Sequence, residues 1–113
     1  MIILDASTKG LEAKLAAGVA TTALPFSLDY VETKDTDQTV FDIGSADGTI
    51  TGTGVAVMLT GPVSGYTRTI KAIFIPNVDS TGATVTIQLN NAGTTRRILK
   101  ALLDVDDNLE YED

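Results

Sequence analysis

Residues 68–89 read RTIKAIFIPNVDSTGATVTIQL, and this stretch decides the fold class. Its first part, 68–75, is rich in β-branched and aromatic residues, and Lys71 is the only charge after Arg68. This composition is typical of a central strand that is covered on both faces. Pro76 cannot donate a hydrogen bond to a neighbouring strand, so it fits the end of this strand.

The rest of the stretch contains a turn and a second strand. Residues 77–82, Asn-Val-Asp-Ser-Thr-Gly, are turn formers, and Val85, Ile87 and Leu89 then recur at period two. A turn between two strand patterns predicts an antiparallel hairpin of 68–75 with 83–89.

The same period-two alternation occurs on both sides of this stretch, and it predicts half-buried strands. Thr, Val and Ile supply 35 of the 113 residues, which favours strands over helices throughout. The alternating sets are Leu11, Ala13 and Leu15; Phe26, Leu28 and Tyr30; and Val55, Val57 and Leu59.

Two further strands are predicted toward the C-terminus. Residues 90–93, Asn-Asn-Ala-Gly, form a second turn before 95–103, which we interpret as a strand, with a helical turn as the alternative. After the acidic turn 104–108, Leu109 and Tyr111 alternate with Glu110 and Glu112 in a short last strand.

Two segments are ambiguous. Residues 9–22 fit a helical spacing as well as an extended one, and the strand-like neighbours on both sides favour the extended form. Residues 42–54 are rich in Gly, Ser and Thr and are expected to form a long loop or an edge hairpin.

Seven or eight short strands with turn signals at regular intervals predict an all-β fold, an antiparallel β-sandwich or jelly-roll-like barrel. Residues 1–25 look less core-like and are expected to form an N-terminal arm or an edge segment, and 26–113 the sandwich domain. No run of about 20 apolar residues predicts a membrane helix, and no signal peptide is recognisable at the N-terminus. We therefore expect a soluble protein made in a cytoplasm.

The residue types limit the chemistry that is expected. The chain contains neither His nor Cys, the most common general base and the most reactive nucleophile, so no enzymatic activity, metal or cofactor is predicted. A net charge of −7 argues against general binding of nucleic acid. The basic residues gather in 68–100, between an acidic N-terminal part and six acidic residues in 101–113. This distribution suggests a solvated mixed surface or complementary patches that meet between subunits.

The C-terminal half resembles a group of known proteins. Ile75-Pro76-Asn77, the turn 78–83, Val85-Thr86-Ile87-Gln88-Leu89, residues 93–100 and the close 107–111 are similar to small structural proteins of tailed bacteriophages, over residues 67–113. Leu24-Pro25-Phe26 is similar to the start of such proteins. A further glycine-rich strand that ends many of them is missing, which leaves open whether a partner strand completes the domain.

The resemblance implies a role in the virion. The leading hypothesis is a capsid decoration (cement) protein that forms a homo-oligomer, expected to be a trimer, on the major capsid protein and stabilises the shell. The alternative is a tail, neck or baseplate component, and the alternative of another class is a carbohydrate-binding β-sandwich module. The residues expected in subunit or capsid contacts are Leu4, Leu11 and Leu15 in the arm and Arg68, Arg96, Arg97 and Lys100 on a basic face.

Overall fold

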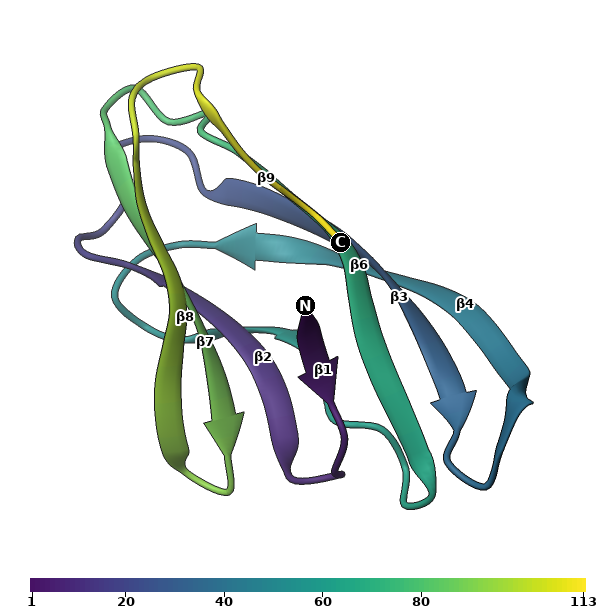
Figure 1. Cartoon of the computed structure of the whole chain (residues 1–113). Helices are drawn as coiled ribbons and strands as arrows, with labels where there is room; N and C mark the ends of the chain where they lie inside the picture. Colours follow the sequence, from purple (N-terminus) through teal and green to yellow (C-terminus); the bar gives the residue numbers. More distant parts are fainter.

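The computed structural model describes all 113 residues as two antiparallel sheets packed face to face, which confirms the all-β sandwich (Figure 1). It contains no helix that could span a membrane. The nine strands are β1 (Ile2–Leu4), β2 (Lys9–Leu15), β3 (Leu24–Lys34), β4 (Asp37–Ile50), β5 (Ala56–Leu59), β6 (Tyr66–Pro76), β7 (Ala83–Asn91), β8 (Thr94–Leu103) and β9 (Asn108–Glu112).

The first sheet has the order β1-β6-β3-β4, and β9 also pairs with β6. Because β1 pairs with residues 68–70 of β6 and β9 with residues 72–76, these two short strands lie end to end along one edge of β6. The amino group of Met1 consequently lies 4.0 Å from the Asp113 carboxylate. The second sheet has the order β5-β2-β7-β8.

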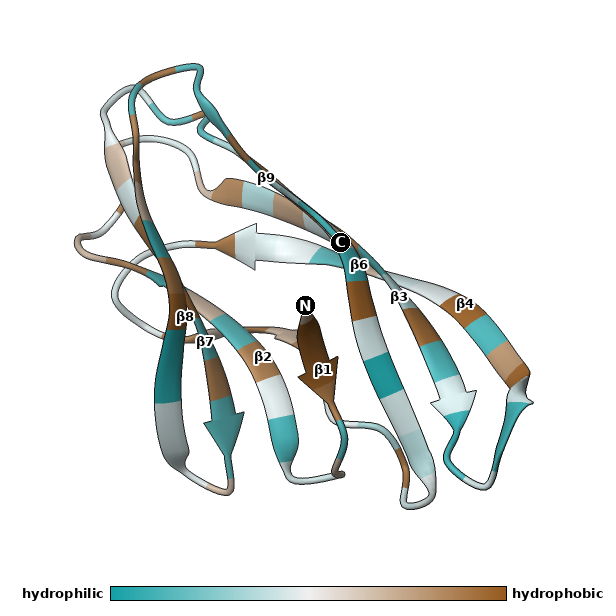
Figure 2. Cartoon of the chain, in the orientation of Figure 1, coloured by the Kyte–Doolittle hydropathy of each residue, from teal (hydrophilic) through white to brown (hydrophobic).

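The core lies between the two sheets and consists of 19 buried hydrophobic residues. The inward positions follow the predicted alternation in β2, β3 and β7, where brown and paler or teal residues succeed one another along the strands (Figure 2). Leu11, Leu28 and Ile87 are examples of predicted inward residues that are buried. Period-two alternation therefore locates most of the core.

The strand β6 departs from the predicted alternation at one position. Its register with β3 shifts so that Asp29 pairs with Ala72 and Tyr30 with Ile70, which leaves Lys71 as an extra residue. A bulge of this kind exchanges the faces of the strand. Ile70, Ile73 and Ile75 are therefore all buried, whereas Phe74 is 40% exposed. The prediction that both faces of β6 are covered was wrong.

The hairpin predicted between 68–75 and 83–89 was also wrong. The strand β6 belongs to the first sheet and β7 to the second, and the two do not pair. The turn 77–82 instead carries the chain from one sheet to the other, and buried polar side chains within it hold this crossover in place. The pattern located the turn correctly but not the sheets that the turn connects.

The second predicted turn does form a hairpin, between β7 and β8. Asn91 pairs with Thr94, so the loop has two residues, Ala92 with φ 51° and Gly93 with φ 95°. Two successive positive φ angles are the signature of the tight turn whose twist matches a β-hairpin. This confirms 95–103 as a strand, and β9 confirms the last predicted strand.

The N-terminal arm is not confirmed. The strand β1 lies at the edge of the first sheet, and β2 pairs on both sides within the second sheet, with β5 and β7. Their inward side chains are part of the common core. The extended interpretation of 9–22 holds for Lys9–Leu15.

The strands β4 and β5 decide one predicted alternative and correct one predicted alternation. Residues 42–50 belong to the edge strand β4, which pairs with β3 in a long hairpin, so the edge-hairpin alternative for 42–54 is the better one. In β5 the buried residues are Met58 and Leu59, whereas Val57 and the preceding residue Val55 are exposed, so the predicted inward set Val55, Val57 and Leu59 holds only for Leu59. A register shift between β2 and β5 accompanies this change of face.

Candidate functional site

The candidate functional features of the chain are one buried polar cluster and two oppositely charged outer faces. The polar cluster lies at the crossover after β6. Asn77, only 1% exposed, donates from its amide nitrogen to the carbonyl oxygens of Thr81, Leu103 and Asp104, at 3.0 to 3.2 Å. Its side-chain oxygen accepts the N–H of Asp79 at 3.0 Å. One side chain thus connects the crossover turn to the end of β8.

Asp79 extends this cluster to the loop between β2 and β3. Its carboxylate accepts the backbone N–H groups of Ala20, Thr21 and Thr22 at 2.8 to 3.1 Å, and that of Ser80 at 2.9 Å. These N–H groups, those of Ala20 and Thr21 above all, hold the pKa of the Asp79 carboxyl well below its usual range, and they outweigh the opposing effect of burial. Such a carboxylate is a structural anchor, because its oxygen atoms are already occupied.

The basic face is the outer surface of the second sheet, and we define it by Lys14, Arg97 and Lys100. Lys14 and Lys100 are the cross-strand partners of Thr86 on either side, and Arg97 is the partner of Gln88. These side chains point away from the core, because Val85 and Ile87, which alternate with Thr86 and Gln88 along β7, belong to the core. Together with Thr53 and Thr95 they line a shallow groove of about 470 Å³.

None of the cations on the basic face has an anionic partner within the chain. The carboxylates paired with Lys or Arg side chains are Asp5, Glu32 and Asp113, which pair with Lys9, Arg68 and Lys71. Glu12, which lies on the same face, accepts the side-chain amides of Gln88 and Asn90 at 3.0 Å each. The positive charge of this face is therefore not neutralised inside the molecule.

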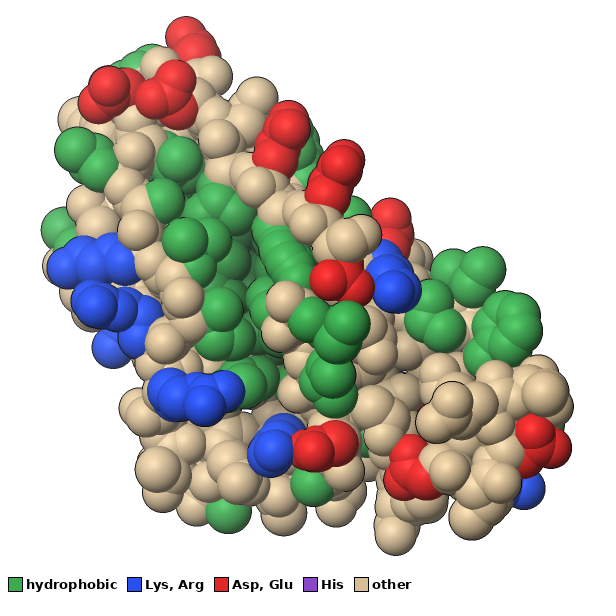
Figure 3. Space-filling model, in the orientation of Figure 1, with side chains coloured by type: hydrophobic (Ala, Val, Ile, Leu, Met, Phe, Trp, Pro, Cys, Tyr) green, Lys and Arg blue, Asp and Glu red, His purple; other side chains and the backbone are tan.

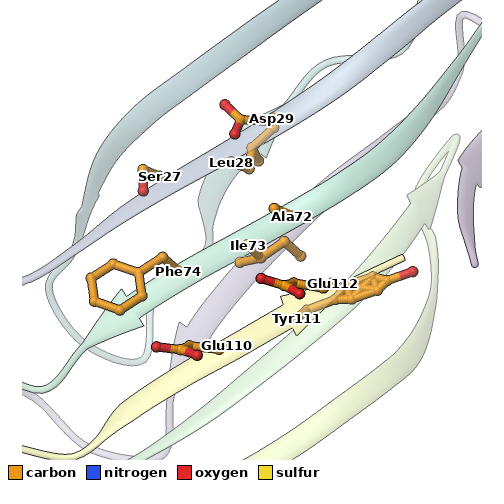
Figure 4. A pocket seen from close by; sticks show the side chains of 9 residues that line it. All are labelled: Ser27, Leu28, Asp29, Ala72, Ile73, Phe74, Glu110, Tyr111 and Glu112. Carbon is orange, nitrogen blue, oxygen red and sulfur yellow. The ribbon is translucent and has the colours of Figure 1, made fainter.

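The acidic face is the outer surface of the first sheet, and we define it by Asp29, Asp47, Glu110 and Glu112. The register puts Asp29, Ala72 and Glu112 in one row across β3, β6 and β9. A second row joins Asp47, Ser27, Phe74 and Glu110. Figure 4 shows this region, a shallow trough of about 230 Å³, with Ser27 and Asp29 on one strand and Glu110 and Glu112 on another.

The acidic face is as free of partners as the basic one. None of its four carboxylates forms a salt bridge. Lys and Arg side chains gather over β8, whereas Asp and Glu side chains lie along β9 and the turn before it (Figure 3). The basic and acidic faces thus carry clusters of unpaired charge of opposite sign on the two sheets, with Glu12 as the one carboxylate beside the basic cluster.

The structure does not bring the predicted contact residues together on one surface. Leu4, Leu11 and Leu15 lie in the core, where they contact their own chain. Arg68 is on the first sheet, where its guanidinium bonds Glu32 at 3.0 Å and lies 5.0 Å from the centre of the Tyr30 ring. Arg97 and Lys100 lie on the basic face.

Arg96 and its neighbour Arg97 point to opposite sides of β8, because successive residues of a strand alternate. Arg96 pairs with Leu89, an inward position, and it lines a groove of about 420 Å³ with Met1, Ile3 and Ile98, a groove that Arg97 also borders. Of the four predicted basic contact residues, only Arg97 and Lys100 thus lie together on the basic face. The sequence gave no signal for the buried Asn77 and Asp79, except that both are turn formers.

Comparison with protein-family models, with curated proteins and with solved structures found no match for this chain.

Proposed function

We propose that the chain is a structural protein of a phage particle: a capsid decoration protein that binds the outer shell as an oligomer and stabilises it. The observation that carries this proposal is the separation of unpaired charge onto the basic and acidic faces. Complementary potentials steer and orient protein partners. A small sandwich with such surfaces is suited to binding other protein subunits.

The residues that carry the resemblance of 67–113 to phage structural proteins have a structural role in this chain. The residues that carry the resemblance, Ile75-Pro76-Asn77 and Asp79, are those that end β6 and fix its crossover to β7. The resemblance therefore supports the proposal through the type of domain that these residues build. The partner of the domain depends on its surfaces.

The proposal is tested by locating the chain on particles. An antibody raised against the chain and applied to virions of the phage or prophage that encodes it should label the whole head surface in electron micrographs. Label restricted to one vertex or to the tail would contradict decoration and favour a tail or neck component. Particles without any label would contradict both roles.

A tail or neck component is the second candidate, and the oppositely charged faces of the sandwich favour it. Two different surfaces that bind each other generate a ring or a filament of copies rather than a two-fold dimer. A hexameric mass in solution would support a tail or neck ring, whereas a trimer would support decoration.

The carbohydrate-binding alternative receives less support. The most exposed aromatic rings are Phe41 on β4 and Phe74 on β6, at 61% and 40%. Their partners on β3 are Thr33 and Ser27, which are about 20 Å apart along the strand. The two rings therefore do not form a joint platform for a sugar. A glycan array that bound the chain would overturn this ranking.

A further inference from the structure

The strands β4 and β8 form two long free edges of the sandwich. Each is the last strand of its sheet, and each pairs on one side only, β4 with β3 and β8 with β7. They have 14 and 10 residues, whereas the other last strand of the second sheet, β5, has four. A long free edge exposes a row of unpaired N–H and C=O groups that can pair with another strand.

Both edges also carry exposed apolar side chains. On β4, Val40, Phe41 and Ile43 are exposed, and Ile43 reaches 78%. On β8, Ile98, Leu99 and Leu102 are exposed, and Leu102 reaches 70%. Figure 1 shows that this part of the β3–β4 hairpin extends beyond the second sheet, and hydrophobic side chains gather over it in Figure 3.

The charges on the two edges are opposite. The strand β4 contains Asp37, Asp42 and Asp47 and no cation, and β8 contains Arg96, Arg97 and Lys100 and no acid. None of these six side chains forms a salt bridge within the chain. Pairing β4 with β4, or β8 with β8, would bring like charges together, whereas pairing β4 with β8 would bring opposite charges together.

We propose that β8 of one copy pairs edge to edge with β4 of a second copy, and that this contact builds the oligomer. The inference deepens the assembly role proposed above and rests on it for its purpose. Charged residues on an edge also protect a sheet against aggregation, but either sign would serve for that. The opposite signs leave one pairing attractive, and that pairing is between unlike edges.

The experiment exchanges the charges of one edge at a time and measures the dissociation constant of self-association by sedimentation. Asp42→Lys with Asp47→Lys makes β4 basic, and Arg97→Glu with Lys100→Glu makes β8 acidic. Each double variant alone should associate at least roughly tenfold more weakly than the wild type. An equimolar mixture of the two should associate more tightly than either variant alone, because the basic β4 of one variant then meets the acidic β8 of the other. A ring of three copies still contains one contact between like variants, so the mixture should regain only part of the lost affinity.

A matched control separates the edges from the faces. Lys14→Glu and Glu110→Lys change charge on the basic and acidic faces but lie on neither free edge, and together they should leave the dissociation constant within about threefold of the wild type. Circular dichroism of every variant should show the folded sheet.

Several results would overturn the edge pairing. These are a wild type that stays monomeric at about 1 mM in low salt, variants that do not recover in the mixture, and face controls that dissociate as strongly as the edge variants. Self-association through the edges without label on any particle would leave the pairing standing and overturn the virion role. Label on particles, together with edge variants that associate as strongly as the wild type, would support the virion role and overturn the edge pairing.

Discussion

The carboxylate of Asp79 accepts hydrogen bonds from both the backbone N–H and the hydroxyl group of Thr21, at 2.8 and 3.0 Å, across 58 residues of sequence. This contact joins the loop after β2 to the crossover between β6 and β7. The backbone N–H groups of Ala16 and Val19 also bond Thr84 and Thr51, and the ionised carboxylate holds the part of the loop that follows them, residues 20–22.

Stability should therefore fall in acid through Asp79. The pKa of its carboxyl is lowered from the ordinary value of 3.8, so the folded protein holds the charged form more tightly than the unfolded chain does. The stabilisation is fully present above pH 3.8 and is lost progressively as the pH falls below that value. Urea unfolding at a series of pH values should show this loss.

The variant Asp79→Asn should be less stable than the wild type at pH 7 and should show a smaller further loss of stability between about pH 4 and pH 2. Asp47→Asn, on the exposed acidic face, is the matched control and should keep the acid dependence of the wild type. Equal acid dependence in Asp79→Asn and the wild type would contradict the assignment.

Asn77→Ala should be among the most destabilising single changes in the chain. It removes three donated hydrogen bonds and one accepted bond at a fully buried position, and it leaves carbonyl oxygens without a partner. We expect a loss of about 3 kcal/mol in the free energy of unfolding, equivalent to about 10 °C in Tm. Val78→Ala, at the exposed neighbouring position, should cost under about 0.5 kcal/mol. Similar losses in both variants would argue for a general effect of the turn.

The strand periodicity, the tight β7–β8 turn and the class of fold follow from local signals, and these are the parts that could be predicted. Leu11, Ala13 and Leu15 alternate because a strand alternates its side chains. The bulge at Lys71 could not be read in the same way, because it depends on the register between β3 and β6. Likewise, the turn after Pro76 signals a change of direction but not a change of sheet.

The candidate surfaces follow the same division. The sequence shows that basic residues gather in 68–100 and acidic ones after residue 100. In the structure, Arg97 and Lys100 lie on the second sheet, and Glu110 and Glu112 lie on the first. The sequence did not predict on which side of its strand each charged side chain lies. Arg96 and Arg97 are neighbours in sequence and both border the groove beside Met1, but only Arg97 also lines the groove on the basic face.

Position 48 should accept only glycine, because the aromatic ring of Phe26 leaves no room for a side chain there. Gly48 of β4 pairs with Phe26 of β3, and a Cβ atom at position 48 would lie 2.8 Å from two ring carbons of Phe26. Gly48→Ala should destabilise the fold by about 2 kcal/mol, measured by urea unfolding. Thr49→Ala, the exposed neighbour, should stay within about 0.5 kcal/mol of the wild type. In Gly48→Ala combined with Phe26→Leu the two losses should be less than additive, and full additivity would show that the ring is not the cause.

Substitutions of Leu11 and Leu102 should have different effects, because Leu11 is buried in the core and Leu102 is exposed. Leu11 is fully buried, so Leu11→Ala should cost about 3 kcal/mol of stability. Leu102 is 70% exposed on β8, so Leu102→Ser should leave the free energy of unfolding nearly unchanged. Since Leu102 lies on a proposed interface, the same variant should weaken self-association severalfold. A Leu102 variant that lost stability but not association would place this side chain in the fold rather than in the contact.

The mass in solution should show whether the copies form a closed ring, and it should fall as the salt concentration rises. An interface between unlike edges closes into a ring when the rotation between copies permits it, and a ring of three copies has a mass of about 35 kDa, from 11.8 kDa a copy. Light scattering at about 50 mM salt should give this trimer, and raising the salt to about 500 mM should shift it toward monomer, because exposed charges are screened. The reversed variant Arg96→Glu with Arg97→Glu should be monomeric at low salt. A mass that rises without limit with concentration would mean that the contact does not close, and a trimer unchanged by salt and by the reversal would show that apolar contacts alone hold it.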